Sequence, residues 1–485
     1  MRLSELILPL AAGLLAAAAG AQSPGTPAAA AGGGVVVRSW VTSADRQRLL
    51  ARGEDTGFGP VTEREDVLVV DPGTTYQEML GFGAAITDAS AWLLEARMGA
   101  APREALLREL FAREGGIGLS MTRVTIGASD FSLRHYSLDE PPGGGTDPEL
   151  RDFSIAPMRE SVIPALRAAH AINPGLAVIA SPWSAPAWMK TSGSLVRGSL
   201  REDAFAPFAR YLVRFADAMA AEGVPLYALT VQNEPHFEPG NYPGMRLEAP
   251  ARARLIGTEL GPLLRAHQPG VRILEWDHNW DEPESPLAVL SDPVAAPYVS
   301  GVAWHCYKGP VEAQGEVHDR FPGKDAFLTE CSGGDWRPGW ARALPWLSRV
   351  VVLGSTRNWA RGVILWNLVL DAEHGPHTGG CTDCRAVVTL DTQTGEITRN
   401  PEYYALAHLS AWVVPGARRI DSSGEVAGLD HVAFRNPDGT IVLMVVNSYM
   451  PERAFAVRVQ GREFAAQIPG LSVATFVWDG SFMVP

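Results

Sequence analysis

Two glutamates at the ends of short apolar segments are the side chains best placed to do chemistry. Glu234 follows the apolar run Tyr227–Val231, and Glu330 follows the run Ala326–Thr329. An ionised carboxylate is costly to bury alone, so one such glutamate could simply cap a loop or contact an arginine. Two of them are what the hydrolysis of a glycoside requires, one to protonate the leaving oxygen and one to attack the sugar.

Glutamates so far apart in sequence can meet only if one fold brings their strands together. From Gln77 onward, apolar strand patterns alternate with helical patterns, which indicates an α/β fold with parallel strands. Eight strands are predicted, at Met79–Ile86, Leu119–Ile126, Ala177–Ser181, Tyr227–Val231, Arg272–Trp276, Val299–Trp304, Ala326–Thr329 and Gly362–Trp366. Eight such units form a (β/α)8 TIM barrel, in which the carboxyl ends of all strands open onto the face that carries the active site.

A second domain is predicted, because 485 residues exceed one ordinary core. Residues 35–75 and 401–485 contain short strand patterns, and they flank residues 76–400, which hold the predicted barrel. The two flanking segments are expected to pack into one β-sandwich that needs both ends of the chain.

The beginning of the chain predicts export. Residues 1–21 have a positive Arg2, an apolar run and a small-residue cleavage site, which together are typical of a secretory signal peptide. Residues 22–34 are rich in Ala, Gly and Pro and are expected to form a flexible linker. The mature protein is therefore expected in a periplasm or outside the cell. No other segment approaches 18 apolar residues, so no integral membrane segment is expected.

Charge and cysteine usage narrow the classes of partner. The net charge of −13 without a long basic cluster argues against nucleic acid or an anionic membrane surface as a partner. Cys381 and Cys384 could form a local disulfide, a redox pair or half a zinc site, and a disulfide is favoured because no second C-x-x-C exists. Whether Cys306 and Cys331 pair is left open. No metal and no cofactor are expected, and the sequence indicates no oligomeric state.

Several motifs resemble glycoside hydrolase family 30. The motifs are Gly81-Phe-Gly-Ala-Ala-Ile-Thr-Asp88, Ser181-Pro-Trp-Ser-Ala-Pro-Ala-Trp-Met-Lys190, Gln232-Asn-Glu-Pro235 and Leu328-Thr-Glu-Cys331. The family includes lysosomal acid glucosylceramidase and bacterial relatives. The resemblance covers most of the chain, and it implies a (β/α)8 barrel with an attached β-sandwich and retaining hydrolysis of β-glycosides.

The resemblance implies that Glu234 is the acid/base and Glu330 the nucleophile. The fourth and seventh strands would place these carboxylates on opposite sides of a narrow opening, about 5 Å apart as retention requires. The two glutamates must then differ in pKa, with that of Glu234 raised while Glu330 carries its charge.

Other side chains at the strand ends are expected to bind the substrate or support the glutamates. The expected substrate-binding residues are Asp88, Trp183, Asn233, Tyr307 and Trp366, and the expected supporting residues are Arg123 and His305. Asn233 could donate to the sugar 2-hydroxyl, and Tyr307 could hold Glu330 by a hydrogen bond. Each Trp could instead fill the core, and Arg123 could instead form a structural salt bridge.

One departure from the family pattern means that the identity of the substrate's leaving group (the aglycone) is not predicted. The loop Asp371–Arg385 carries the C-x-x-C motif, which acid glucosylceramidase lacks at this place. The expected function is that of a secreted retaining β-glucosidase of the glucosylceramidase type. An endo-β-1,6-glucanase or β-xylosidase of the same family is the alternative, and a non-catalytic carbohydrate-binding protein is the alternative from another class.

Overall fold

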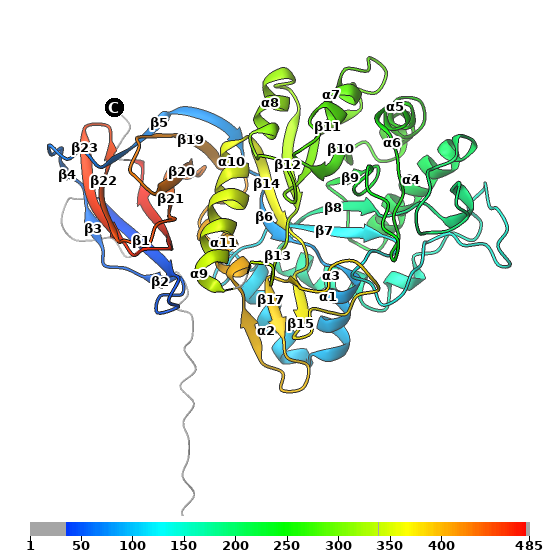
Figure 1. Cartoon of the computed structure of the whole chain (residues 1–485), viewed down its shortest axis with the longest axis horizontal. Coiled ribbons are helices and arrows are strands. Elements are labelled where there is room, and N and C mark those ends of the chain that lie inside the picture. Colours follow the sequence, from blue (N-terminus) through cyan, green and yellow to red (C-terminus); the bar gives the residue numbers. More distant parts are fainter. Residues whose placement is uncertain (1–34, 338, 482–485) are drawn as a thin grey trace, which may run out of the picture.

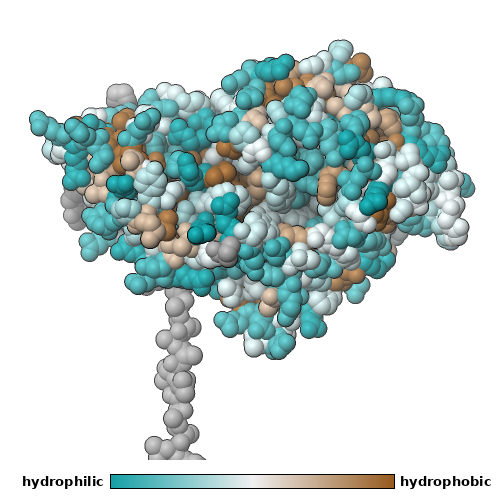
Figure 2. Space-filling view, in the orientation of Figure 1, coloured by the Kyte–Doolittle hydropathy of each residue, from teal (hydrophilic) through white to brown (hydrophobic). Residues whose placement is uncertain are grey.

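A barrel and a β-domain lie side by side in the computed structural model, which describes residues 35–337 and 339–481 (Figure 1). The predicted signal peptide, residues 1–21, and the predicted linker, residues 22–34, lie outside these ranges. Within the described ranges no helix combines the length and apolar character needed to cross a bilayer. The face of the molecule in Figure 2 is mainly hydrophilic, with hydrophobic residues in small scattered patches.

The predicted eight strands close into a parallel barrel. They are β6 (Gly81–Ala84), β7 (Met121–Ile126), β8 (Ala177–Pro182), β9 (Ala228–Thr230), β10 (Arg272–Asn279), β11 (Val299–His305), β12 (Asp325–Glu330) and β14 (Ala360–Leu365). Nearly all of their residues are buried, because helices cover the outside and side chains fill the inside. The prediction of a (β/α)8 barrel is therefore confirmed.

The helices between the strands cover the outside of the barrel (Figure 1). They are α1 (Asp88–Trp92), α2 (Ala100–Phe111), α3 (Val162–Ile172), α4 (Phe205–Ala221), α5 (Ala249–Arg254), α6 (Gly261–His267), α7 (Glu284–Leu290), α8 (Ala313–Arg320), α9 (Trp340–Trp346) and α10 (Ser355–Arg357). In α4 the buried residues Phe208, Leu212, Phe215 and Met219 recur every three or four positions, which forms one apolar face toward the strands.

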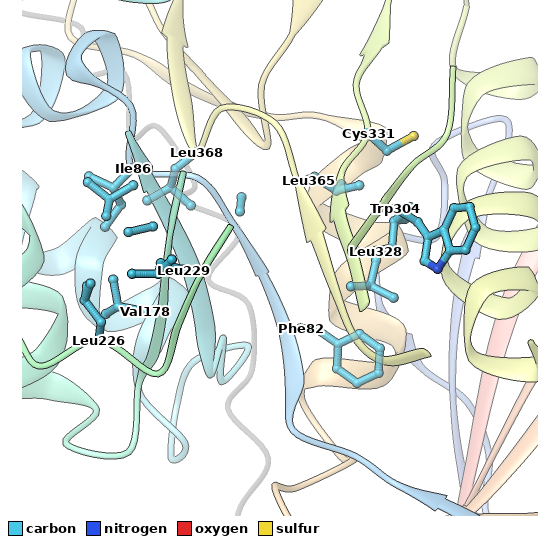
Figure 3. Packing of buried hydrophobic residues seen from close by; sticks show 14 of the residues in the cluster. Phe82, Ile86, Val178, Leu226, Leu229, Trp304, Leu328, Cys331, Leu365 and Leu368 are labelled. Carbon is cyan, nitrogen blue, oxygen red and sulfur yellow. The ribbon is translucent and has the colours of Figure 1, made fainter. Parts of the chain in front are cut away.

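Apolar side chains fill the two sides of the barrel wall differently. Outside the strands, Val178, Leu229, Trp304 and Leu328 belong to one large cluster that packs between strands and helices (Figure 3). Inside the barrel lies a smaller apolar cluster, to which every barrel strand except β6 contributes. Its buried residues are Met121, Ala177, Ile179, Ala228, Leu274, Ala303, Phe327 and Ile364. Since these residues fill the lower part of the lumen, polar side chains are left for the carboxyl ends of the strands.

The β-domain is built from both ends of the chain, as predicted. The strand β1 (Val36–Ser43) pairs with β24 (Ser472–Asp479), and β5 (Val67–Glu78) pairs with β19 (Arg418–Ser423) and β22 (Arg453–Val459). The other strands of this sheet are β2 (Ala51–Arg52), β3 (Thr56–Gly57), β4 (Gly59–Pro60), β20 (Leu429–Arg435), β21 (Thr440–Asn447) and β23 (Arg462–Ile468). The strands β19 and β23 were not predicted.

Short elements after β12 and β14 fold over the carboxyl end of the barrel wall. The strand β13 (Gly333–Gly334) pairs with β16 (Cys384–Arg385), which joins the segment after β12 to the C-x-x-C loop. A three-stranded sheet contains β15 (Val369–Asp371), β17 (Val388–Leu390) and β18 (Ile397–Arg399). Helix α11 (Pro401–Ser410) then leads into the β-domain.

A buried histidine joins α11 to two neighbouring strands of the β-domain, β1 and β24. The ring nitrogens of His408 lie 2.9 Å from the hydroxyls of Thr42 on β1 and Thr475 on β24. Burial lowers the pKa of His408 to about 3. The folded protein therefore holds this imidazole neutral at a pH where the unfolded chain protonates it.

Acid should destabilise the protein through His408. The unfolded pKa is about 6.5, so the free energy of unfolding should fall by about 1.4 kcal/mol per pH unit as the pH drops from 6.5 toward 3. Above pH 6.5 this contribution should be absent. Denaturant unfolding at pH 7.5 and pH 5 should show about 2 kcal/mol more acid destabilisation in the wild type than in a His408→Gln variant. Equal pH dependence of the two proteins would refute this assignment.

Candidate active site

The two predicted catalytic glutamates meet at the carboxyl end of the barrel. Glu330 is the last residue of β12, and Glu234 lies shortly after β9, so three strand-to-strand steps of the barrel wall separate them. A carboxylate oxygen of each lies within 4.8 Å of the other. Retaining glycosidases hold their carboxyl groups about 5–5.5 Å apart, whereas inverting enzymes need about 6.5–9.5 Å. The spacing fits a retaining enzyme.

Unusual backbone conformations aim two of the acidic side chains. Glu234 has φ of 45° and Asp277 has φ of 59°, in the left-handed region that non-glycine residues seldom adopt. Asp277 lies at a register shift of β10 between Trp276 and His278, and its carbonyl accepts the Glu234 backbone N–H at 3.0 Å. Backbone outliers of this kind cluster at functional sites, and here two such residues, Glu234 and Asp277, are joined by a backbone hydrogen bond.

Arg123 joins three residues of the site. Its guanidinium, which is fully buried on β7, donates to Glu330 at 2.5 Å and to Asn233 and Asp277 at 2.7 Å each. The structure thus places Arg123 both in an interior salt bridge and beside the predicted nucleophile. Since the amide oxygen of Asn233 accepts from Arg123, its Nδ2 is left to donate to a ligand.

Tyr307 contacts Glu330 as the sequence suggested. Its hydroxyl donates to Glu330 Oε1 at 3.0 Å, while Arg123 donates to Oε2. The tyrosine is 41% exposed, so its ring lies at the solvent-facing edge of the site. Both oxygens of Glu330 therefore accept hydrogen bonds, which fixes the orientation of the carboxylate.

His305 lies between two carboxylates. One ring nitrogen is 3.2 Å from Glu234 and the other is 3.1 Å from Asp277. Burial alone would lower the pKa of His305, but the charge of Glu330 and the hydrogen bonds to Asp277 and Glu234 raise it to about 9. His305 is therefore an imidazolium at neutral pH and donates from both nitrogens.

Asp277 receives five donors and was not selected from the sequence as a site residue. Besides Arg123 and His305, the hydroxyls of Ser181, Thr230 and Thr329 donate to it at 2.6–2.7 Å. Burial alone would raise the pKa of Asp277, but Arg123 and His305 hold it far below its usual value. Asp277 is thus a permanent negative charge that fixes the two cations.

The catalytic pair has room for one shared proton. Three carboxylates, those of Glu234, Glu330 and Asp277, face the two cations, so one further proton balances the cluster. Burial raises the pKa of Glu330. Burial also raises that of Glu234, but the His305 hydrogen bond and the charge of His278 outweigh it, so this pKa lies below its ordinary value. Burial and neighbouring charges by themselves therefore favour a proton on Glu330, the reverse of the order predicted from the sequence.

The hydrogen bonds favour the opposite distribution of that proton. Both oxygens of Glu330 accept hydrogen bonds, from Arg123 and Tyr307, so a proton on Glu330 would weaken its charge-assisted bond to Arg123. Glu234 contacts His305 through Oε1, and its Oε2 accepts no hydrogen bond from any described residue. We therefore assign the shared proton to Glu234 Oε2, where a substrate oxygen could receive it.

The two predicted sugar-binding tryptophans pack against each other. The rings of Trp183 and Trp366 are stacked with centroids 5.0 Å apart, and the Arg123 guanidinium lies 4.7 Å and 5.5 Å from their centroids. Each tryptophan is only 3% exposed. Their observed role is to pack around Arg123, and sugar stacking on these rings stays a prediction.

Two aspartates, Asp88 and Asp130, lie near the opening of the barrel, and Asp130 is the one that interacts with the charges of the catalytic pair. Asp88 accepts from the Tyr136 hydroxyl at 3.1 Å, and burial raises its pKa to about 6. Burial and the charges of Glu330 and Glu234 raise the pKa of Asp130 well above its usual value. Its buried Oδ1 has no partner among the described residues, as expected for an oxygen that awaits a ligand. The available signal in the sequence was the position of Asp130 in the loop that follows β7, which ends at Ile126.

One group of described residues brings potential metal donors together. Donor atoms of Glu234, His305 and Glu330 lie within 4.8 Å of one another. Both nitrogens of a protonated His305 are occupied by hydrogens, and Arg123 already neutralises Glu330. The chemistry of this group therefore suits an ion-pair network better than a metal centre.

Comparison with known proteins identifies the same two domains. The model described as "Glycosyl hydrolase family 30 TIM-barrel domain" matches residues 79–413, and "Glycosyl hydrolase family 30 beta sandwich domain" matches residues 416–476. The chain is 33% identical over 429 residues to an endo-1,6-β-D-glucanase of Aspergillus fumigatus, covering 83% of this chain and 85% of the relative. It is 30% identical over 446 residues to lysosomal acid glucosylceramidase of Mus musculus, covering 85% and 83%.

A solved structure agrees with both the fold and the family. The structure of an endo-β1,6-glucanase superimposes with a TM-score of 0.84 and 34% sequence identity, covering 91% of this chain and 99% of that one. The match extends over the barrel with its paired glutamates and over the β-domain. The chain therefore belongs to glycoside hydrolase family 30, and it is a glycosidase.

Proposed function

We propose that the protein is a retaining endo-β-1,6-glucanase that uses Glu330 as nucleophile and Glu234 as acid/base. This substrate differs from glucosylceramide, the substrate type that the sequence alone favours. Two similar proteins support it. The Aspergillus fumigatus relative, which is 33% identical, and the solved structure with a TM-score of 0.84 are both described as endo-β-1,6-glucanases. The C-x-x-C loop 371–385, which departs from acid glucosylceramidase, supports it further.

The observation that carries the mechanism is the 4.8 Å approach of the two carboxylates, with only one of them fully hydrogen-bonded. Glu330, oriented by Arg123 and Tyr307, attacks the anomeric carbon. Glu234 gives its proton to the departing glycosidic oxygen, and then removes a proton from the water that releases the sugar from Glu330. The free Nδ2 of Asn233 can donate to the 2-hydroxyl of the bound sugar.

The surrounding charges suit both steps of this reaction. When Glu330 becomes an ester it loses its negative charge, and Glu234 gains one as it loses its proton. The negative charge of the pair is therefore constant while its position changes. Arg123 beside Glu330 and His305 beside Glu234 offer a cation at either position, and Asp277 holds both cations in place.

The substrate is tested by comparing three glycosides at equal enzyme concentration. The expected result is a kcat/KM for a linear β-1,6-glucan at least tenfold above that for glucosylceramide in detergent, with slow turnover of an aryl β-glucoside. Early release of mixed oligosaccharides would show attack on internal linkages. Faster turnover of glucosylceramide than of the glucan would overturn the substrate assignment while leaving the retaining mechanism in place.

We propose further that the protein is exported and acts outside the cytoplasm. The signal-like residues 1–21 support this, and so do the disulfides Cys306–Cys331 and Cys381–Cys384, because an oxidising compartment preserves such bonds. Amino-terminal sequencing of the protein recovered from periplasm or medium should begin near Gln22. Recovery only from the cytoplasm, with Met1 retained, would overturn this proposal.

A further inference from the structure

We propose that the disulfide between Cys306 and Cys331 is a positioning device for the nucleophile Glu330. Each cysteine directly follows a residue of the site, because Cys306 follows His305 and Cys331 follows Glu330. The disulfide therefore joins the two strand ends that carry the predicted nucleophile and its imidazolium neighbour. This inference rests on the proposed role of Glu330 as nucleophile, and it does not depend on which glycoside is the natural substrate.

The register of the barrel explains how this disulfide can act on Glu330. In the parallel pair β11–β12, His305 and Glu330 are register partners, and the next residue along each strand is the bonded cysteine. Successive side chains of a strand point to opposite faces. His305 and Glu330 therefore point into the barrel, and the cysteine that follows each of them points outward. Cys331 belongs to the apolar cluster outside the wall together with Trp304 (Figure 3).

Backbone pairing on both sides of β12 is irregular near Glu330. Between β11 and β12 the register shifts between Trp304 and His305, immediately before the partners that matter. On the other side of β12, the register with β14 is confined to the pairs Ala326–Ala360 and Leu328–Val363, and one backbone hydrogen bond follows beyond Glu330, from the Trp366 N–H to the Cys331 carbonyl at 2.8 Å. A covalent bond at the next residue compensates for the irregular ladder at this point.

The disulfide also closes a ring that contains the Tyr307–Glu330 hydrogen bond. The chain runs from Glu330 to Cys331, crosses the sulfur atoms to Cys306, and continues to Tyr307, whose hydroxyl returns to Glu330 at 3.0 Å. The backbone N–H of Tyr307 donates to the Asn279 side chain at 3.0 Å, which anchors the ring to β10. The covalent link therefore fixes the distance between the nucleophile and its hydroxyl donor.

The second disulfide offers a matched control. Cys381 and Cys384 are three positions apart and close only a short segment of one loop. Neither of them adjoins a residue that contacts the catalytic pair. Removing this bond tests for general effects of cysteine loss, such as lower stability.

The experiment compares two double variants with the wild type on an aryl β-glycoside at 25 °C. In Cys306→Ala/Cys331→Ala, kcat should fall about 10- to 100-fold while KM changes less than threefold, because a displacement of about 1 Å at a reacting group has this scale of effect. In Cys381→Ala/Cys384→Ala, whose apolar cluster includes Trp183 and Trp366, any effect should fall on KM and substrate choice, and no comparable loss of kcat is expected. Thermal unfolding is measured for all proteins. A Cys306→Ala/Cys331→Ala protein that is folded and has wild-type kcat would overturn the proposal, however much its Tm has fallen.

A double-mutant cycle separates positioning from mere stabilisation. Tyr307→Phe removes the hydroxyl and should lower kcat in the wild type. If the disulfide acts through the Tyr307–Glu330 contact, the same substitution should have little further effect in Cys306→Ala/Cys331→Ala. Fully additive effects would show that the disulfide acts elsewhere, and would overturn the proposal.

If Cys306→Ala/Cys331→Ala does not fold, the disulfide is instead broken by chemical reduction of the folded protein. In the Cys381→Ala/Cys384→Ala background, Cys306–Cys331 is the one disulfide that the four-cysteine chain can still form. A water-soluble phosphine reduces it to two thiols and is itself converted to the phosphine oxide with water. Thiols are counted by alkylation and mass spectrometry. kcat should fall in proportion to the reduced fraction, and full activity with both thiols free would overturn the proposal.

Discussion

Replacing Glu330 by Gln should lower kcat by roughly 10⁴- to 10⁶-fold, the scale seen when an enzyme loses its nucleophile. An amide cannot form the glycosyl ester, and its NH₂ group would face either the Arg123 guanidinium or the Tyr307 hydroxyl, both of which donate in the wild type. A 2-fluoro glycoside that traps the ester should label Glu330 in the wild type and should label nothing in the variant. Peptide mapping identifies the labelled residue.

Glu275→Gln is the matched control for this substitution. Glu275 is also a fully buried glutamate of a barrel strand, and its partner Arg252 donates to it at 2.5 Å. This pair lies outside the catalytic cluster, so the control should lower the Tm and leave kcat within about threefold. A label on another residue, or an active Glu330→Gln protein, would contradict the assignment of the nucleophile.

Replacing Glu234 by Gln should give an effect that depends on the leaving group. With a β-1,6-glucan, whose leaving alcohol needs a proton, kcat should fall about 10²- to 10⁴-fold. With a dinitrophenyl glycoside the first step needs no acid, so the glycosyl enzyme should form rapidly and accumulate. Added azide should then release it as a glycosyl azide, because a small anion needs no general base.

The pH profile gives a second readout of Glu234. In the wild type acting on the β-1,6-glucan, activity should decline as the pH rises and the shared proton leaves Glu234 Oε2, and this limb of the profile should be missing in Glu234→Gln. The assignment of the proton to Glu234 would be wrong if the limb persists unchanged. An equal loss of activity for good and poor leaving groups would likewise exclude Glu234 as the general acid.

Most of the barrel could be predicted because its strands are buried on both faces. Continuous apolar runs that end in polar residues mark such strands, and all eight were located in this way. The strands β19 and β23 were missed because they mix buried with exposed residues without a regular period and carry several charges, as in Arg462–Ile468. A sheet with one solvated face gives this weaker pattern.

The site was predictable where it depended on residue type and motif, and not where it depended on backbone geometry. Glu234 and Glu330 follow from the motifs, and Tyr307 from its place after a predicted strand. The five donors of Asp277 follow from a bulge in β10, which no local pattern indicates. Pairing of Cys306 with Cys331 requires the register between β11 and β12.

The pairing of β1 with β24 has a consequence for how the protein can be made. During synthesis β1 and β5 emerge before the barrel, yet their partners β24, β19 and β22 emerge after it. The β-domain must therefore assemble after translation, through contacts of very large sequence separation, which slows folding. A product of premature termination that ends at Asn400 would display β1 and β5 as naked strand edges, open to pairing with other chains.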